Sequence, residues 1–240
     1  MRSLAILVLA LACGAAQALE IRRYETRIDV DRDGAALATA SVDLAGAAAG
    51  RFRLPVGFAK LADFRPGEAS PGVSLAAKGN ADGAWVEVEL PDGVPSETTL
   101  GFSFRANGVL FVPKPEAGQK ATLPKGSRLL RHRFVNTQEA PIARYAATVL
   151  FPPEVIAHRV NEQLPRPGRK EFAPRVELDR FDGRQGARLQ LANLRQGDRT
   201  SMELEIVDER RSAVWLLLLV PLAAGYLFFF RDLVRPPRPS

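Results

Sequence analysis

An uncharged apolar run near the C-terminus constrains this chain more than any other feature. Residues 212–230 read SAVWLLLLVPLAAGYLFFF, nineteen residues without Asp, Glu, Lys or Arg. At about 1.5 Å per residue, a helix of this length just crosses a hydrocarbon core of roughly 30 Å. Trp215 and Tyr226, near its two ends, suit the membrane interfaces. The run predicts a transmembrane helix over 212–230, with a buried core helix as the alternative.

The other end of the chain has the pattern of a secretory signal peptide. Arg2 is followed by the apolar run Leu4–Ala12 and then by Ala16-Gln17-Ala18. This is the order of charge, hydrophobic core and small-residue cleavage site that signal peptides show. We expect cleavage after Ala18, so that residues 1–18 are removed.

Cys13, the only cysteine, raises a lipoprotein alternative. The bacterial lipoprotein motif usually has Leu three residues before the cysteine, where this chain has Ala10. With ordinary cleavage the mature protein has no cysteine, which excludes disulfides and thiolate metal ligands.

The short tail 231–240 sets the expected orientation. It carries Arg231, Arg235 and Arg238 against one Asp232. Basic residues beside a span favour the cytoplasmic side. The tail and the signal peptide together predict a protein of the bacterial inner membrane with an extracytoplasmic, periplasmic ectodomain and a cytoplasmic C-terminus.

Between the two ends, the chain alternates apolar and polar residues as half-buried strands do. Residues 22–44 predict a hairpin whose tip is Asp31-Arg32-Asp33-Gly34. Residues 113–127, PKPEAGQKATLPKGS, lack periodicity and predict a linker or long loop. The expected units are 1–18 signal peptide, 19–112 N-terminal β-sandwich domain, 113–127 linker, 128–208 second β-sandwich domain, 212–230 transmembrane helix and 231–240 tail.

Part of the second unit resembles a known kind of domain. Asn136-Thr137 follows a predicted strand, and Leu194-Arg195-Gln196-Gly197-Asp198 precedes the strand at Met202–Ile206. With these features, residues 128–207 are similar to immunoglobulin-like β-sandwich domains of bacterial envelope proteins. The resemblance implies an all-β fold, with one or two antiparallel immunoglobulin-like sandwiches before the transmembrane helix.

Basic residues gather around the second unit and are the candidate binding site. Part of the net charge of +6 comes from Arg2 and the tail, so the charge does not by itself argue for nucleic acid, and we expect none as a partner. If the basic loops meet, they predict binding of anionic glycan, lipid or an acidic partner protein. The alternative is a solvated loop surface. The candidate binding residues are Lys125, Arg128, Arg131, Arg133, Arg166, Arg169 and Lys170.

Sequence signs of catalysis are weak. Serine catalysis needs a base near the nucleophile, and the histidines His132 and His158 both lie between apolar strand residues, which favours core positions. No His or Cys cluster has metal-ligand spacing, and no phosphate-binding or Gly-x-Ser-x-Gly motif is present. We therefore expect no enzymatic activity, cofactor or metal. The predicted function is protein interaction or scaffolding in a membrane complex, with another envelope protein as the expected partner. The alternatives are a binding module for anionic glycan or lipid and an uncharacterised hydrolase.

Overall fold

The chain folds mainly into β-strands. The structure is a computed structural model that describes residues 19–80, 83–112, 127–153, 155–163, 175–208, 219–226 and 228. Its strands, in chain order, are β1 (Glu20–Val30), β2 (Ala36–Ala45), β3 (Gly50–Pro55), β4 (Ala62–Ala69), β5 (Ser74–Asn80), β6 (Gly83–Leu90), β7 (Glu97–Ala106), β8 (Leu110–Phe111), β9 (Ser127–Val135), β10 (Ile142–Leu150), β11 (Val155–Gln163), β12 (Arg175–Phe181), β13 (Arg184–Leu194) and β14 (Arg199–Asp208).

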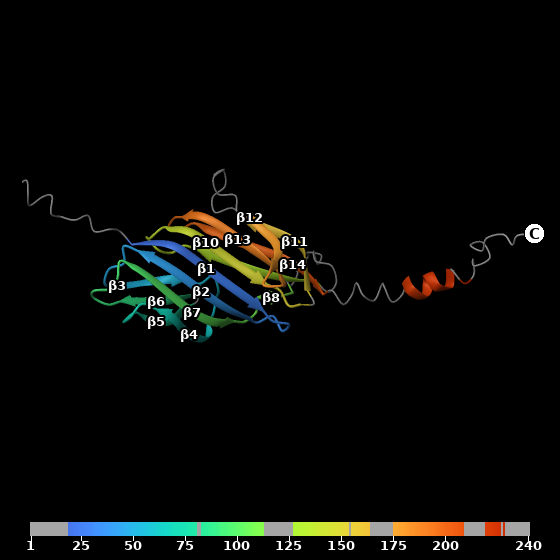
Figure 1. Ribbon diagram of the computed structural model, residues 1–240, viewed down its shortest axis with the longest axis horizontal. Coiled ribbons are helices and arrows are strands. Elements are labelled where there is room, and N and C mark those ends of the chain that lie inside the picture. The colour runs from blue at the N-terminus through green and yellow to red at the C-terminus, as the bar shows by residue number, and fades with distance from the viewer. Residues whose placement is uncertain are drawn as a thin grey trace, which may run out of the picture.

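The strands form three sheets (Figure 1). The seven-stranded sheet has the order β12-β13-β10-β1-β2-β7-β4. The four-stranded sheet has the order β11-β14-β9-β8, and the three-stranded sheet the order β3-β6-β5. The pairing of β1 with β10 is parallel, whereas the other described pairings are antiparallel.

The predicted hairpin at residues 22–44 is confirmed. β1 and β2 pair antiparallel, with Val30 opposite Ala36. The tip is held by Asp31, whose Oδ1 accepts hydrogen bonds from the backbone N–H groups of Asp33 at 3.0 Å and Ala35 at 2.9 Å. Gly34 has a φ of +86°, a conformation that glycine adopts without strain. Acidic and glycine residues at the tip thus serve the turn.

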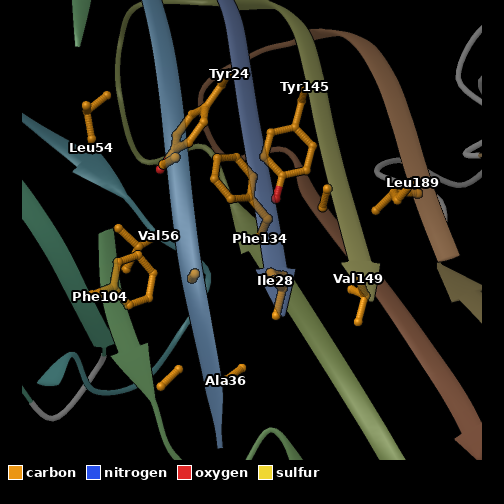
Figure 2. Close-up of a cluster of buried hydrophobic side chains, with 14 of the residues drawn as sticks. Tyr24, Ile28, Ala36, Leu54, Val56, Phe104, Phe134, Tyr145, Val149 and Leu189 are labelled. Atoms are coloured by element: carbon orange, nitrogen blue, oxygen red, sulfur yellow. The ribbon is translucent and has the colours of Figure 1, made fainter. Parts of the chain in front are cut away.

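Aromatic side chains join the sheets in the core. Figure 2 shows Phe134 of β9 between Tyr24 of β1 and Tyr145 of β10. The ring centroid of Phe134 lies 4.1 Å from that of Tyr145 and 5.4 Å from that of Tyr24. The Tyr24 hydroxyl donates to the Pro55 carbonyl oxygen of β3 at 2.5 Å. Since buried aromatic pairs contribute about 0.5–1.5 kcal/mol beyond area burial, these rings fix the four- and three-stranded sheets against the large sheet.

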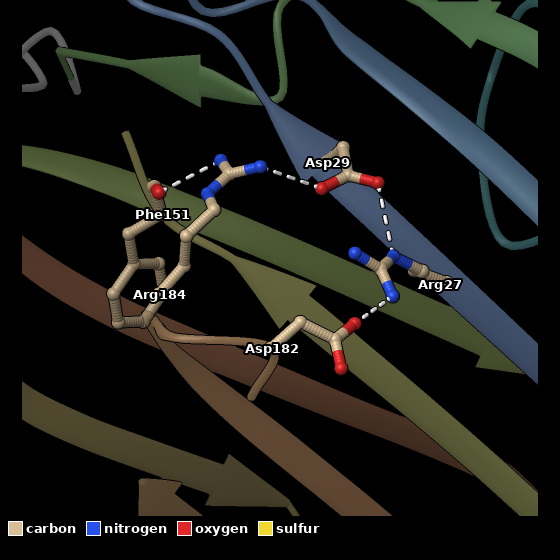
Figure 3. Close-up of polar contacts among 5 residues, drawn as sticks. All are labelled: Arg27, Asp29, Phe151, Asp182 and Arg184. Atoms are coloured by element: carbon tan, nitrogen blue, oxygen red, sulfur yellow. Dashed lines mark hydrogen bonds and ion pairs between the residues drawn. The ribbon is translucent and has the colours of Figure 1, made fainter. Parts of the chain in front are cut away.

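A polar network holds one end of the large sheet together (Figure 3). The guanidinium of Arg184 donates to Asp29 Oδ1 at 2.8 Å and to the Phe151 carbonyl oxygen at 2.9 Å. Arg27 donates to the other Asp29 oxygen at 3.1 Å and pairs with Asp182. Arg184 therefore connects the start of β13 with β1 and with the end of β10.

Both predicted sandwich domains contribute to the seven-stranded sheet. β1, β2, β4 and β7 come from residues 19–112, and β10, β12 and β13 from residues 128–208. Buried side chains of both ranges belong to one hydrophobic cluster. The parallel pairing of β1 with β10 brings the two ranges together. Most of the predicted linker at 113–127 lies outside the described residues, and its last residue, Ser127, begins β9.

The predicted fold class is wrong in two respects. The large sheet is mixed, and three sheets take the place of antiparallel immunoglobulin-like sandwiches. The predicted transmembrane helix at 212–230 is also contradicted, because within the part of the chain that is described no helix has the length and apolar character needed to cross a membrane. Of residues 212–230, the structure describes 219–226 and 228, which are helical.

The structure does not test the other predictions for the two ends of the chain. Residues 1–18, with the cleavage site and Cys13, lie outside the described residues, as does the tail 231–240. The signal peptide and the extracytoplasmic location stay predictions.

Candidate functional site: a groove along strand β9

A groove lies beside β9. It has a volume of about 580 Å³ and is open along one side. One wall is the outer half of β9, and the other is made by the segments around Gly57, Gly83 and Gly108. Its lining combines apolar and cationic side chains: Phe58, Val109, Phe111, Val135, Arg131 and Arg133. Such a groove can hold a ligand that has both an apolar part and a negative charge.

Along this groove β9 presents a strand edge. On its other side β9 pairs with β14 from Ser127 to Val135. On the groove side β8 pairs only with Leu129 and Leu130. The chain before β8 turns away, since the Val109 N–H donates to the Gly34 carbonyl oxygen at 3.0 Å. Among the described strands, none therefore pairs with β9 beyond Leu130 on this side.

The direction of the backbone groups follows from the register. In an antiparallel pair, alternate residues exchange hydrogen bonds with the partner strand, and the residues between them point their N–H and C=O groups away. Asn136 bonds through its N–H to Asp198 and through its C=O to Gly197, so the even-numbered residues face β14. The backbone groups of Arg131, Arg133 and Val135 therefore point to the groove side.

Gly57 closes the floor of the groove against β9. It has a φ of +76°, and a Cβ atom there would lie 2.7 Å from the Arg133 carbonyl oxygen and 2.7 Å from His132 Cε1. Any side chain at this position would thus collide with β9. Glycine allows the end of β3 to approach the strand edge.

His132 lies under this floor and is part of the core. It is 1% exposed, and its Nε2 atom lies 2.6 Å from the Tyr145 hydroxyl oxygen. Burial lowers the pKa of His132 to about 4, and burial raises the pKa of Tyr145 well above its ordinary value. The imidazole and the phenol thus form a hydrogen bond between two uncharged groups. The Nδ1 atom of His132 has no hydrogen-bond partner among the described residues.

Glu203 of β14 organises the two arginines of the groove. Its Oε1 atom accepts a hydrogen bond from Arg131 Nε at 2.5 Å and lies 3.7 Å from Arg133 Nη2. The Arg131 guanidinium also lies over the Phe111 ring, 5.1 Å from its centroid. Arg131 is therefore held in place, whereas the Arg133 side chain is 62% exposed.

The predicted basic cluster is divided by the structure. Arg131 and Arg133 line the groove, but Arg128 donates to the Arg32 carbonyl oxygen in the β1–β2 turn. Lys125, Arg166, Arg169 and Lys170 lie outside the described residues, so their role in binding stays a prediction. The core position predicted for His132 is confirmed, and the side chain of His158 is outside the described part.

Sequence reasoning missed the groove-forming residues Gly57, Phe58 and Phe111. Each stands in a short apolar stretch with no motif around it. Only the proximity of Gly57 to β9 shows why glycine is needed. Within the described ranges there is also no group of three or more His, Cys, Asp or Glu side chains placed to hold a metal ion.

Comparisons with known proteins give only distant structural likeness. No protein-family model matches the chain, and no curated protein matches it. Among solved structures, native yeast leukotriene A4 hydrolase is similar over 80% of this chain and 29% of its own, with 10% identity and a TM-score of 0.43. A putative nutrient binding protein from Legionella pneumophila matches over 80% of this chain and 68% of its own, with 8% identity and a TM-score of 0.44.

An M1 zinc metallopeptidase from Deinococcus radiodurans is similar over 78% of this chain and 42% of its own, with 13% identity and a TM-score of 0.38. This chain spans less than a third of the yeast enzyme and less than half of the metallopeptidase.

The predicted function and partners need correction. They described a single-pass envelope protein that scaffolds a membrane complex, with the membrane as one partner. Neither is supported, because the described residues contain no helix that could span a membrane.

Proposed function

We propose that this chain is a binding module that takes up an extended peptide segment beside β9. The observation that carries the proposal is the strand edge from Arg131 to Val135, which borders a groove of about 580 Å³. Addition of a peptide strand to such an edge uses main-chain hydrogen bonds for affinity and side-chain pockets for specificity. The absence of catalysis expected from the sequence stays part of this proposal.

Two features of the groove favour a peptide as ligand. The backbone groups of Arg131 and Val135 and the N–H of Arg133 point to the groove side and offer donors and acceptors along an extended strand, whereas the Arg133 carbonyl oxygen is covered by Gly57. Phe58, Val109 and Phe111 supply apolar contacts in the same groove. An extended peptide alternates its side chains between two faces, so it can satisfy the strand edge and the apolar wall together.

The test is selection of short random peptides on the full-length chain, with affinities then measured by fluorescence anisotropy. Ala59 is exposed and lines the groove, so Ala59→Phe fills the groove without disturbing the core. We expect this substitution to weaken the selected peptides about tenfold or more, a loss of about 1.4 kcal/mol. Ala192→Phe, at an exposed position of β13, is the matched control and should leave affinity unchanged.

Amide exchange measured by NMR tests the binding mode. A bound strand should slow exchange at Arg131, Arg133 and Val135, which face the groove, and leave the already bonded amides of His132 and Phe134 unchanged. Equal binding to wild type and Ala59→Phe, or unchanged exchange at all three groove-facing amides, would contradict the proposal.

A further inference from the structure

The charges along the groove indicate which peptides it selects. Two guanidinium groups, those of Arg131 and Arg133, share the single carboxylate of Glu203. Glu203 Oε1 lies 2.5 Å from Arg131 Nε and 3.7 Å from Arg133 Nη2, so its hydrogen bond is with Arg131. Among the described residues that line the groove, this leaves one positive charge without a close carboxylate.

Of the two arginines, Arg133 has more N–H donors available to a ligand. Guanidinium groups carry five N–H donors, and the described residues give Arg133 only the long contact with Glu203. Its side chain is 62% exposed, whereas that of Arg131 is 33% exposed and packs on Phe111. A ligand can therefore reach Arg133 without displacing an existing hydrogen bond.

On the basis of the proposed function, we propose that the bound peptide carries a carboxylate that pairs with Arg133, while Glu203 and Phe111 hold Arg131 in position beside it. A carboxylate fits because its two oxygens match the planar guanidinium fork in a bidentate pair. A single excess positive charge also matches a monoanion. The carboxylate is either an acidic side chain or the C-terminus of the peptide.

The position of Phe111 adds a second requirement on the peptide. The Phe111 ring borders the groove and lies under Arg131, while Phe58 and Val109 line the same groove. Side chains two residues apart in an extended peptide lie on the same face. The peptide therefore has an apolar residue two positions from an acidic side chain, or two positions from its C-terminal residue.

The experiment is a double-mutant cycle that compares the affinities of charge-changed peptides for charge-changed variants of the protein. Peptides selected on the full-length chain are made with each Asp or Glu changed to Gln or to Lys, and with the C-terminus free or amidated. Each is measured against wild type, Arg133→Glu and Arg144→Glu. Arg144 is an exposed arginine of β10 in the large sheet, so it makes the same charge change away from the groove.

We expect removal of the carboxylate to weaken binding about tenfold to wild type and to have little effect on Arg133→Glu, because the partner is then already lost. A Lys-containing peptide should bind Arg133→Glu better than wild type. Arg144→Glu should behave as wild type. Loss on amidation alone identifies the C-terminal carboxylate as the group, and loss on the Gln change alone identifies the side chain.

The results separate this inference from the proposed function. If selected peptides bind in the groove but neither neutralisation nor Arg133→Glu weakens them, the carboxylate inference is overturned and the peptide-binding function stands. Equal weakening by Arg133→Glu and Arg144→Glu also overturns the inference, because it reports only overall charge. If no peptide binds in a manner sensitive to Ala59→Phe, the proposed function fails first.

Discussion

His132 and Tyr145 form a buried hydrogen bond between two sheets, with 2.6 Å between His132 Nε2 and the Tyr145 hydroxyl oxygen. His132 belongs to β9 of the four-stranded sheet and Tyr145 to β10 of the large sheet. Burial favours the uncharged form of both groups, and the imidazole tautomer sets which of them donates. The contact links the strand that borders the groove with the centre of the molecule.

This buried histidine predicts a pH-dependent stability. Burial lowers the pKa of His132 from 6.5 to about 4, so between these values the unfolded chain binds a proton that the folded chain does not. The contribution of His132 to stability is fully present above pH 6.5 and is lost as the pH falls toward 4. The loss amounts to about 3 kcal/mol. Urea unfolding at several pH values measures it.

The control for this pH dependence is His132→Gln, which has no titrating group at the site. The difference in pH dependence between wild type and variant isolates His132 from the carboxylates that titrate in the same range. NMR titration of the His132 ring gives its pKa directly. A ring pKa near 6.5 would contradict the prediction.

Substitution of Gly57 should be more damaging than substitution of another glycine with the same backbone angle. Gly57 and Gly93 have φ values of +76° and +75°, but only Gly57 has atoms of β9 within 4 Å of a new Cβ. We expect Gly93→Ala to cost about 1 kcal/mol from backbone strain. Gly57→Ala should cost about 3 kcal/mol, because the clash with Arg133 adds to the strain. Urea unfolding of both variants gives the difference, and equal losses would contradict the close approach.

Loss of Asn136 should destabilise the turn that ends β9. Its side-chain N–H groups donate to the carbonyl oxygens of Ala140 and Leu194, both at 3.1 Å, and its Oδ1 accepts from the Gln138 N–H at 3.0 Å. Asn136→Ala leaves these groups without partners and should cost about 2 kcal/mol in unfolding free energy. Asn136→Asp keeps the acceptor but turns a carboxylate toward two carbonyl oxygens. It should be no more stable than Asn136→Ala, and a near wild-type result would contradict these contacts.

Arg184 should contribute more to the unfolding free energy than a surface ion pair with a similar distance between its charged groups does. It connects three strands through Asp29 and Phe151, and its side chain is 35% exposed. After discounting for solvent screening, we expect Arg184→Met to cost about 1 kcal/mol. Arg51→Met removes the exposed 2.8 Å pair with Glu89 and should leave the unfolding free energy unchanged within error. Equal effects in thermal or urea unfolding would show that the network adds nothing.

Local patterns in the sequence predicted the strands that depend on near neighbours. The β1–β2 hairpin follows from alternation and from a tip rich in Asp and Gly, since both signals act over a few residues. The alternation around His132 also predicted its burial correctly. For the 212–230 run, the absence of charge indicated a low cost of transfer into lipid, but the described part of the chain holds no helix that could span a membrane.

The sequence by itself determined the β character of most described segments between residues 20 and 208, the turn at Asp31–Gly34 and the apolar faces that pack inward. Only the tertiary structure decided that Tyr24 pairs with Tyr145 in parallel strands, that Gly57 reaches the edge of β9, and that one Glu203 serves Arg131 and Arg133. The physical reason is the separation along the chain over which each feature is set. Side-chain alternation is set by the backbone of a single strand, whereas the groove arises where segments far apart in the chain meet around a shared core.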